Sequence, residues 1–164
     1  MQTIQSEDLR LRPAQFPDDC VDALPWYSDP EVLHYSEGAG AEPYSLEMIE
    51  RMYQYLMKIG ELYMIEVRTE NGWLAIGDVT LSKETLPIVI GNPDYRSKGI
   101  GSQVIGMLIE RAKILGWEKL KVKQIFEYNE RSRRLFTRYG FRETGKGVDA
   151  RGQAYRSYEL ILQS

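Results

Sequence analysis

The feature that most constrains the fold of this chain is a glycine-containing loop between an apolar run and an amphipathic segment. The apolar run covers residues 86–90, and the loop reads Arg-Ser-Lys-Gly-Ile-Gly-Ser over residues 96–102. This order predicts a strand that leads through a short loop into a helix. A helix start has backbone N–H groups without partners and a partial positive charge. The loop therefore predicts a site for a phosphate or pyrophosphate group.

Two common phosphate-binding motifs do not fit this loop. A nucleotide P-loop has its lysine directly after a glycine, whereas Lys98 precedes Gly99 here. A dinucleotide fingerprint needs glycine or alanine at the sixth position from Gly99, and this chain has Val104 there. The remaining pattern is Arg-x-x-Gly-x-Gly, in which Gly99 and Gly101 allow a bulky anion to approach the backbone. An ordinary strand-to-helix turn also accounts for these glycines, so the interpretation depends on the rest of the chain.

Further segments match one known family. Residues 128–141 place Asn129 at the start of a predicted helix that ends in Gly140-Phe141, and residues 9–13 read Leu-Arg-Leu-Arg-Pro before an acidic helix. The loop closely resembles the acetyl-CoA pyrophosphate loop of the GNAT superfamily of N-acetyltransferases, and residues 128–141 resemble the second cofactor segment of that family. Residues 9–13 and the acidic helix after them resemble its first strand and helix. Residues 26–32, Trp-Tyr-Ser-Asp-Pro-Glu-Val, are similar to the branch that contains ribosomal-protein and aminoglycoside acetyltransferases.

The resemblance implies an α/β fold in a single domain over residues 1–164. Its central sheet would be mixed, mostly antiparallel, flanked by helices and splayed at the acetyl-CoA strand. The residue pattern predicts a hairpin at Asn71-Gly72 and an irregular loop over residues 35–44. It predicts strands near 8–13, 61–68, 73–81, 86–91, 118–125, 141–146 and 153–162, and helices near 17–27, after Ser45, from 99 to 115 and over 129–139.

Acetyl-CoA is the cofactor that the resemblance implies. The strand end would bind the pantetheine arm through its backbone, and the helix start would bind the pyrophosphate. The expected cofactor contacts are Val89, Ile90, Gly91, Arg96, Ser97, Lys98, Gly99, Ile100, Gly101, Ser102, Asn129 and Phe136. For Arg96 and Lys98 the alternative is simple solvation, and Asn129 also fits the role of a helix N-cap. Three arginines on one predicted helix face either reach the 3′-phosphate or are solvated: Arg131, Arg134 and Arg138.

The chain departs from the family at one position that carries chemistry. Many members have a tyrosine seven residues after the asparagine, where it can protonate the leaving thiolate, and this chain has Phe136 there. Phenylalanine can pack against the pantetheine but cannot donate a proton. A thiol is a fair leaving group without a dedicated acid. We therefore leave the general acid unassigned, and the departure weakens a polyamine-type acceptor more than it weakens catalysis.

Two residues are candidates for the general base. Asp78 shares a strand face with apolar neighbours, which would raise its pKa and suit it to accept an ammonium proton; an edge carboxylate without a role is the alternative. His34 is the only histidine and lies where the family forms its acceptor wall, although a lone histidine is often structural. Glu66 and Glu84 are weaker alternatives. Among the aromatic residues of the first half, Trp26 and Tyr35 are the expected substrate contacts.

Composition narrows the class of protein. The formal net charge of −3 argues against a nucleic-acid partner, which usually requires a basic face. The single Cys20 excludes an internal disulfide, and we expect it to be a small buried residue of the first helix. No apolar run is long enough for a membrane span, and the first residues do not form a signal peptide. We therefore expect a cytoplasmic protein without a metal site, and a homodimer through free sheet edges is possible.

These observations predict an acetyl-CoA-dependent N-acetyltransferase. It would transfer acetyl to a primary amine by direct attack, and the acceptor would be a small-molecule amine or a protein N-terminus. The alternative is a catalytically inactive CoA-binding sensor or regulatory module, which the absent tyrosine keeps open. An RNA-binding role for the arginine-rich helix is a third hypothesis, which the net acidity opposes.

Overall fold

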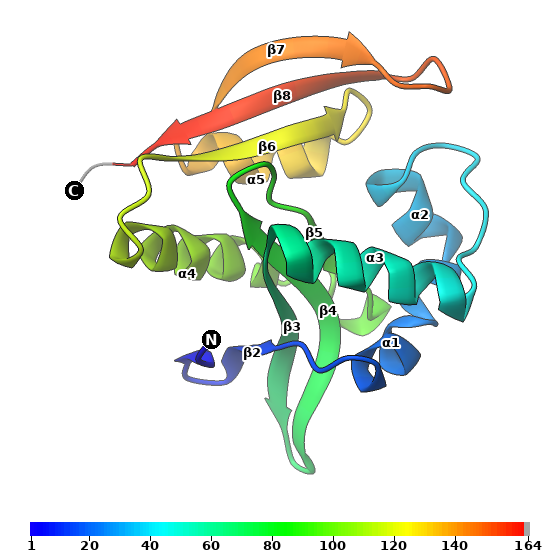
Figure 1. The fold of residues 1–164 in the computed structure, drawn as a ribbon, viewed down its shortest axis with the longest axis vertical. Coiled ribbons are helices and arrows are strands. Elements are labelled where there is room, and N and C mark those ends of the chain that lie inside the picture. The colour runs from blue at the N-terminus through cyan, green and yellow to red at the C-terminus, as the bar shows by residue number, and fades with distance from the viewer. Residues whose placement is uncertain (163–164) are drawn as a thin grey trace.

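The computed structural model describes residues 1–162, which form two antiparallel sheets with helices packed around them (Figure 1). The first sheet has the strand order β1-β2-β3-β4-β5, and the second has the order β6-β8-β7. The elements are β1 (Ile4–Ser6), β2 (Leu9–Pro13), α1 (Asp18–Ala23), η1 (Trp26–Ser28), α2 (Pro30–Ser36), α3 (Leu46–Ile59), β3 (Gly60–Thr69), β4 (Gly72–Ser82), β5 (Ile88–Ile90), η2 (Pro93–Tyr95), α4 (Ile100–Ile114), β6 (Lys119–Phe126), α5 (Glu130–Arg138), β7 (Arg142–Val148) and β8 (Ala154–Ile161).

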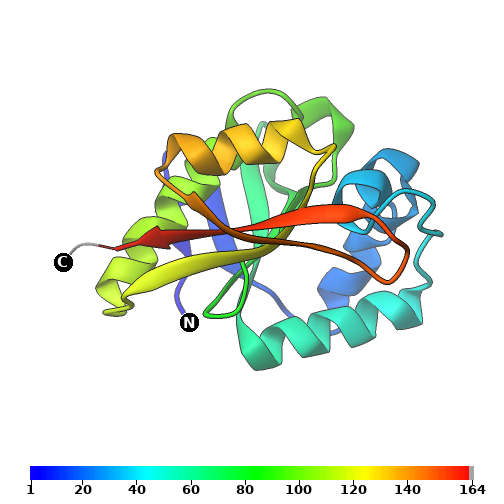
Figure 2. The ribbon, with the colours of Figure 1, turned by 90° about the horizontal axis from the view of Figure 1, so that it is seen from above.

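The two sheets separate between β5 and β6. In the described residues, β5 pairs only with β4, and β6 pairs with β8. Figure 2 shows β6 and β8 crossing above the strands of the first sheet, with α5 on one side and α3 on the other. The predicted antiparallel α/β fold with a splayed cofactor strand is confirmed. One free edge of β5 therefore faces the gap between the sheets.

The hairpin β3–β4 forms where Asn71-Gly72 predicted it. Gly72 has a φ of 107°, which suits glycine, and the Thr69 hydroxyl donates to the Gly72 carbonyl at 2.8 Å. The ladder from Gly60↔Ser82 to Thr69↔Gly72 is interrupted by one irregularity after Ile65. The strand β1 was not predicted, because three residues at an edge carry little pattern.

Three of the α-helices in residues 1–162 start at side-chain caps. Asp29, Ser45 and Asn129 each accept a hydrogen bond from a backbone N–H of the first turn. The prediction of one helix over residues 17–27 is wrong: α1 ends at Ala23, and a short 3-10 turn follows. Pro25 explains the break, because it has no N–H to donate to the Val21 carbonyl, which accepts from Leu24 N instead. The Asp29-Pro30 start of α2 was also missed.

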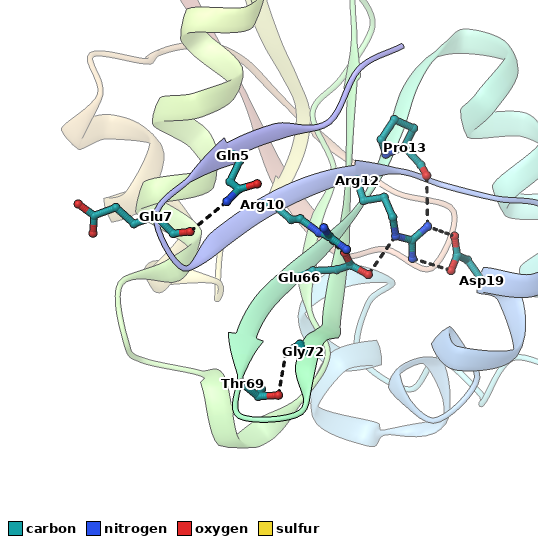
Figure 3. A network of polar contacts seen from close by, with 9 residues as sticks. All are labelled: Gln5, Glu7, Arg10, Arg12, Pro13, Asp19, Glu66, Thr69 and Gly72. Carbon is teal, nitrogen blue, oxygen red and sulfur yellow. Dashed lines mark hydrogen bonds and ion pairs between the residues drawn. The ribbon is translucent and has the colours of Figure 1, made fainter.

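A buried polar network joins β2, β3 and α1 (Figure 3). The Glu66 carboxylate accepts from Arg10 at 2.6 Å and from Arg12 at 3.0 Å, and Arg12 also holds Asp19 with two bonds of 2.9 Å. Glu66 and Asp19 are buried, so this network replaces their lost hydration. The interpretation of Glu66 as an alternative base is therefore wrong, since two arginines occupy both of its oxygens.

Candidate active site

A cavity of about 760 Å³ lies where the two sheets separate. Its walls come from both sides of the gap, namely β5 and β6, and from the first turns of α4 and α5. Asp78 of β4 and the segment after α2 also line it. The splay thus provides an internal space of the size typical of small-molecule sites, and it is lined by most of the residues that the sequence singled out.

The helix start at α4 is open to this cavity. Gly99 is the N-cap with a φ of 78°, and no side chain caps the helix. A Cβ atom at Gly99 would meet nothing within 4 Å, and one at Gly101 would meet only Leu135 at 3.5 Å. The first N–H groups of α4 are thus free of side-chain caps beside an open glycine cradle. This arrangement fits a pyrophosphate, as predicted for Gly99, Ile100, Gly101 and Ser102.

The edge of β5 is the second element that was predicted to contact the cofactor. Pro87 accepts from Thr80 N at 3.0 Å, and Gly91 N donates to the Ile76 carbonyl at 2.8 Å. Antiparallel pairing alternates, so Val89, which pairs with Asp78, also directs its backbone groups to β4. The backbone groups of Ile88 and Ile90 therefore face the gap. Of the three predicted strand contacts, only Ile90 has a free N–H, and Ile88 was missed because residue type does not reveal register.

Arg96 has a different role from the predicted phosphate contact. Its guanidinium donates to Asp29 at 3.0 Å and to Glu31 at 2.8 Å. It also donates to the carbonyls of Ile90 and Gly91 at 3.2 and 3.0 Å. These partners use its donors, so Arg96 joins the start of α2 to the end of β5. The carboxylates of Asp29 and Glu31, at the start of α2, thus hold the Arg96 side chain. Lys98 and Ser97, the latter with a φ of 59°, are exposed on that loop.

Asp78 is a buried carboxylate at the cavity wall. Its oxygens accept from the Tyr27 hydroxyl at 2.9 Å and from the Tyr53 hydroxyl at 2.7 Å. Burial raises the pKa of Asp78 to about 6, although the two hydroxyl hydrogen bonds lower it. The sequence placed both tyrosines among the aromatic residues that could line a pocket but did not pair them with Asp78, because they lie far from it along the chain. The arrangement is a proton acceptor whose pKa lies close to neutral pH.

Two predicted site residues of the first half of the chain do not line the cavity: His34, the second candidate base, and Trp26, an expected substrate contact. His34 stacks on Tyr128 at 4.4 Å between ring centroids and is absent from the cavity lining. Trp26 is buried, and its ring lies against Gly91, where an added Cβ would come within 2.1 Å of the indole. Packing thus accounts for both residues, and the structure supports neither as base or substrate contact. Tyr35 does line the cavity.

The start of α5 forms the remaining wall. Asn129 caps this helix and donates to the Tyr35 carbonyl at 3.5 Å, and it also lines the cavity. Phe136 is buried, lines the cavity and packs edge-to-face on Phe141. The Tyr139 hydroxyl donates to the Ser102 carbonyl, so it is engaged between α5 and α4.

The three arginines of α5 have different surroundings. Arg131 and Arg138 line the cavity, whereas Arg134 forms an ion pair with Glu130 at 3.0 Å.

Within residues 1–162, no helix has the length and apolar character of a membrane span. The same residues contain no group of three or more His, Cys, Asp or Glu side chains that could hold a metal ion.

Comparison with known proteins agrees with this geometry. The family model described as an acetyltransferase (GNAT) domain matches residues 8–142, and the chain therefore belongs to this family of acetyltransferases. No curated protein matches the chain.

Solved structures share the whole fold. A domain from Methanocaldococcus jannaschii is 25% identical, with a TM-score of 0.78 over 94% of this chain and 98% of that one. A spermidine N-acetyltransferase from Vibrio cholerae, solved with CoA and spermine, is 20% identical, with a TM-score of 0.76 over 96% and 97%. An acetyltransferase of Salmonella typhimurium that modifies the N-terminal serine of ribosomal protein L7/L12 is 16% identical, with a TM-score of 0.75 over 96% and 97%.

Proposed function

We propose that this protein transfers the acetyl group of acetyl-CoA to a primary amine by direct attack, the acceptor being a small-molecule amine or a protein N-terminus. The observation that carries the proposal is that one cavity is lined by both the open helix start of α4 and the buried Asp78. A phosphate-binding element and a proton acceptor thus serve the same space. Similar folds in the comparison are those of spermidine and ribosomal-protein acetyltransferases, and CoA is present in the former.

The residues present fit acetyl-CoA, which supplies the acetyl group as a thioester when bound. The N–H groups at residues 99–102 bind the pyrophosphate, and the free edge of β5 at Ile88 and Ile90 binds the extended arm. Asn129 and Phe136 supply the opposite wall. Phe136 offers the pantetheine arm an apolar surface and has no proton to donate.

Asp78 prepares the acceptor for attack. A primary amine is an ammonium ion at neutral pH, and it becomes a nucleophile only after losing a proton. A carboxylate oxygen of Asp78 accepts this proton, which its pKa of about 6 and the hydroxyls of Tyr27 and Tyr53 make possible. The neutral amine would then be able to attack the acetyl carbon of bound acetyl-CoA, and the carbon–sulfur bond would break as the new carbon–nitrogen bond forms. The CoA thiolate released in this way would take its proton from solvent or from the nitrogen.

A CoA-binding sensor is the second candidate function. The observation that favours it is Phe136, which lines the cavity where many family members have a proton-donating tyrosine. Tyr139 cannot replace that acid, because its hydroxyl donates to the Ser102 carbonyl. Release of free CoA thiol from acetyl-CoA distinguishes the two. We expect amine-dependent release with at least one acceptor among alkylamines, polyamines, aminoglycosides and short peptides. Binding of acetyl-CoA without release in any of these would support the sensor and refute catalysis.

A further inference from the structure

Glu37 is the carboxylate of the cavity that the proposed reaction does not use. Three carboxylates line the cavity: Glu31, Glu37 and Asp78. Glu31 is held by Arg96 at 2.8 Å, and Asp78 is the proton acceptor. Glu37 ends α2 as its C-cap residue and is half-buried. Among residues 1–162 no cationic side chain forms an ion pair with it.

The charge of Glu37 is offset only in part by its surroundings, because no ion pair in residues 1–162 involves it. Burial raises the pKa of Glu37, and the Tyr44 hydroxyl and the more distant charge of Arg151 oppose this rise. Arg151 is exposed on the turn between β7 and β8. The pKa of Asp78 is raised chiefly by burial, and the negative charge of Glu37 raises it further. The two carboxylates therefore share one field, which favours a cationic guest.

Aromatic rings form the walls around these carboxylates. Tyr27 and Tyr44 stack with centroids 5.6 Å apart, and both line the cavity. Tyr35 and Tyr55 line it as well. Ring faces attract ammonium groups and pack against methylene groups, so carboxylates among tyrosines suit an amine with an apolar spacer.

Gln153 fixes the segment that carries Glu37. Its side-chain amide donates to the Ala39 carbonyl at 2.9 Å and accepts from Ala39 N at 3.2 Å. A Cβ at Gly38, whose φ is 114°, would come within 2.6 Å of the Gln153 oxygen. Asp149 accepts from Gln153 N at 2.8 Å and thereby shapes the β7–β8 turn. Figure 2 shows this turn beside the segment that follows α2.

We infer that Glu37 binds a second ammonium group of the acceptor, positioned by Gln153, so that the acceptor is a small amine with at least two positive charges. The inference rests on the proposed N-acetyltransferase function and selects within its acceptors. One ammonium loses its proton to Asp78, and the other remains charged at Glu37. A peptide N-terminus supplies only the first. This inference departs from the expectation that Phe136 weakens a polyamine-type acceptor, because Phe136 bears on protonation of the leaving sulfur, whereas the charges of the acceptor meet Glu37 and Asp78.

A matched pair of acceptors tests the inference. Diaminobutane and butylamine differ in the second amine group, so the ratio of their kcat/KM values reports its recognition. We expect the full-length wild-type protein to favour diaminobutane by about 10- to 100-fold, the range of a hydrogen bond to a charged group. The kcat/KM values for an aminoglycoside and for a linear triamine then show whether the site prefers amines on a ring or on a linear chain. Absence of a preference, or better turnover of a short peptide, would overturn the inference.

Variants separate recognition from folding. In Glu37→Gln the preference ratio should fall towards one, and in Gln153→Ala the KM for diaminobutane should rise about tenfold with a smaller change in kcat. Glu47→Gln, an exposed α3 carboxylate, should keep the wild-type ratio. A Glu37→Gln variant that lowers both kcat/KM values alike would contradict recognition.

Calorimetric binding of diaminobutane and butylamine gives a readout independent of turnover. Binding that favours diaminobutane only while Glu37 is present supports the inference even if no acetyl transfer occurs. Transfer to butylamine with equal binding of both amines would refute the inference while leaving the proposed function intact.

Discussion

Replacement of Asp78 by asparagine separates the chemical role of this carboxylate from its effect on stability. Asn has nearly the same shape and keeps an oxygen that can accept from Tyr27 and Tyr53, which now bond the carboxylate at 2.9 and 2.7 Å. It cannot ionise or accept a proton. The substitution therefore removes the proton acceptor while retaining the packing of a residue that is only 3% exposed.

The magnitude follows from the pKa of Asp78, which folding raises from 3.8 to about 6. The folded state holds the proton more tightly, so this group lowers the stability as pH rises from about 4 to about 6. A shift of about two units corresponds to roughly 3 kcal/mol. Asp78→Asn lacks this loss. Its free energy of unfolding relative to wild type should therefore increase by roughly 2.5 kcal/mol between pH 4 and pH 8, because part of the roughly 3 kcal/mol is already lost at pH 4.

Two assays read out this substitution. Urea denaturation at several pH values gives the difference in stability, with Asp22→Asn of an exposed α1 carboxylate as the control. Thiol release gives kcat/KM, which should fall by about 10²–10⁴ at neutral pH as expected for loss of a general base. The acid limb near pH 6 should also disappear. A variant that retains that limb, or a stability difference independent of pH, would refute the assignment.

Three other predictions concern separate parts of the site. Gly101→Ala should raise the Kd for acetyl-CoA at least about tenfold without loss of stability, because the added Cβ meets only Leu135 at 3.5 Å; unchanged affinity, with Gly145→Ala as control, would remove the loop from the site. Tyr53→Phe removes a hydrogen bond to ionised Asp78, so the acid limb of kcat/KM should move up by about one pH unit, and a downward shift would contradict this. Glu66→Ala leaves Arg10 without a carboxylate partner and Arg12 with Asp19 alone, and it should cost about 3 kcal/mol in urea denaturation, whereas a loss below about 1 kcal/mol would show that the network is dispensable.

Local signals in the sequence predicted the framework because they arise from neighbouring residues. The Asn71-Gly72 turn, the Ser45 and Asn129 caps and the glycines before α4 each act within a few residues. The family resemblance supplied the splay between β5 and β6, which no local pattern contains. The break after Ala23 had a local cause in Pro25 that the helical pattern concealed.

The roles of charged and aromatic side chains depended on contacts between distant segments. Arg96 lies beside a phosphate-binding loop but pairs with Asp29 and Glu31 of α2. Asp78 was predicted from its strand face, yet the Tyr27 and Tyr53 hydroxyls that hold it come from segments far along the chain. Composition and spacing do not encode such pairings, because tertiary packing alone determines which polar atoms meet.

The most direct test of the central claim is transfer of an isotope-labelled acetyl group from acetyl-CoA to an amine, followed by mass spectrometry of the acceptor. We predict that wild-type protein attaches the label to the amine nitrogen of an acceptor at pH 8, and that Asp78→Asn does so at least about 10²-fold more slowly. Tight binding of acetyl-CoA with no labelled product across alkylamines, polyamines, aminoglycosides and peptides would contradict the account.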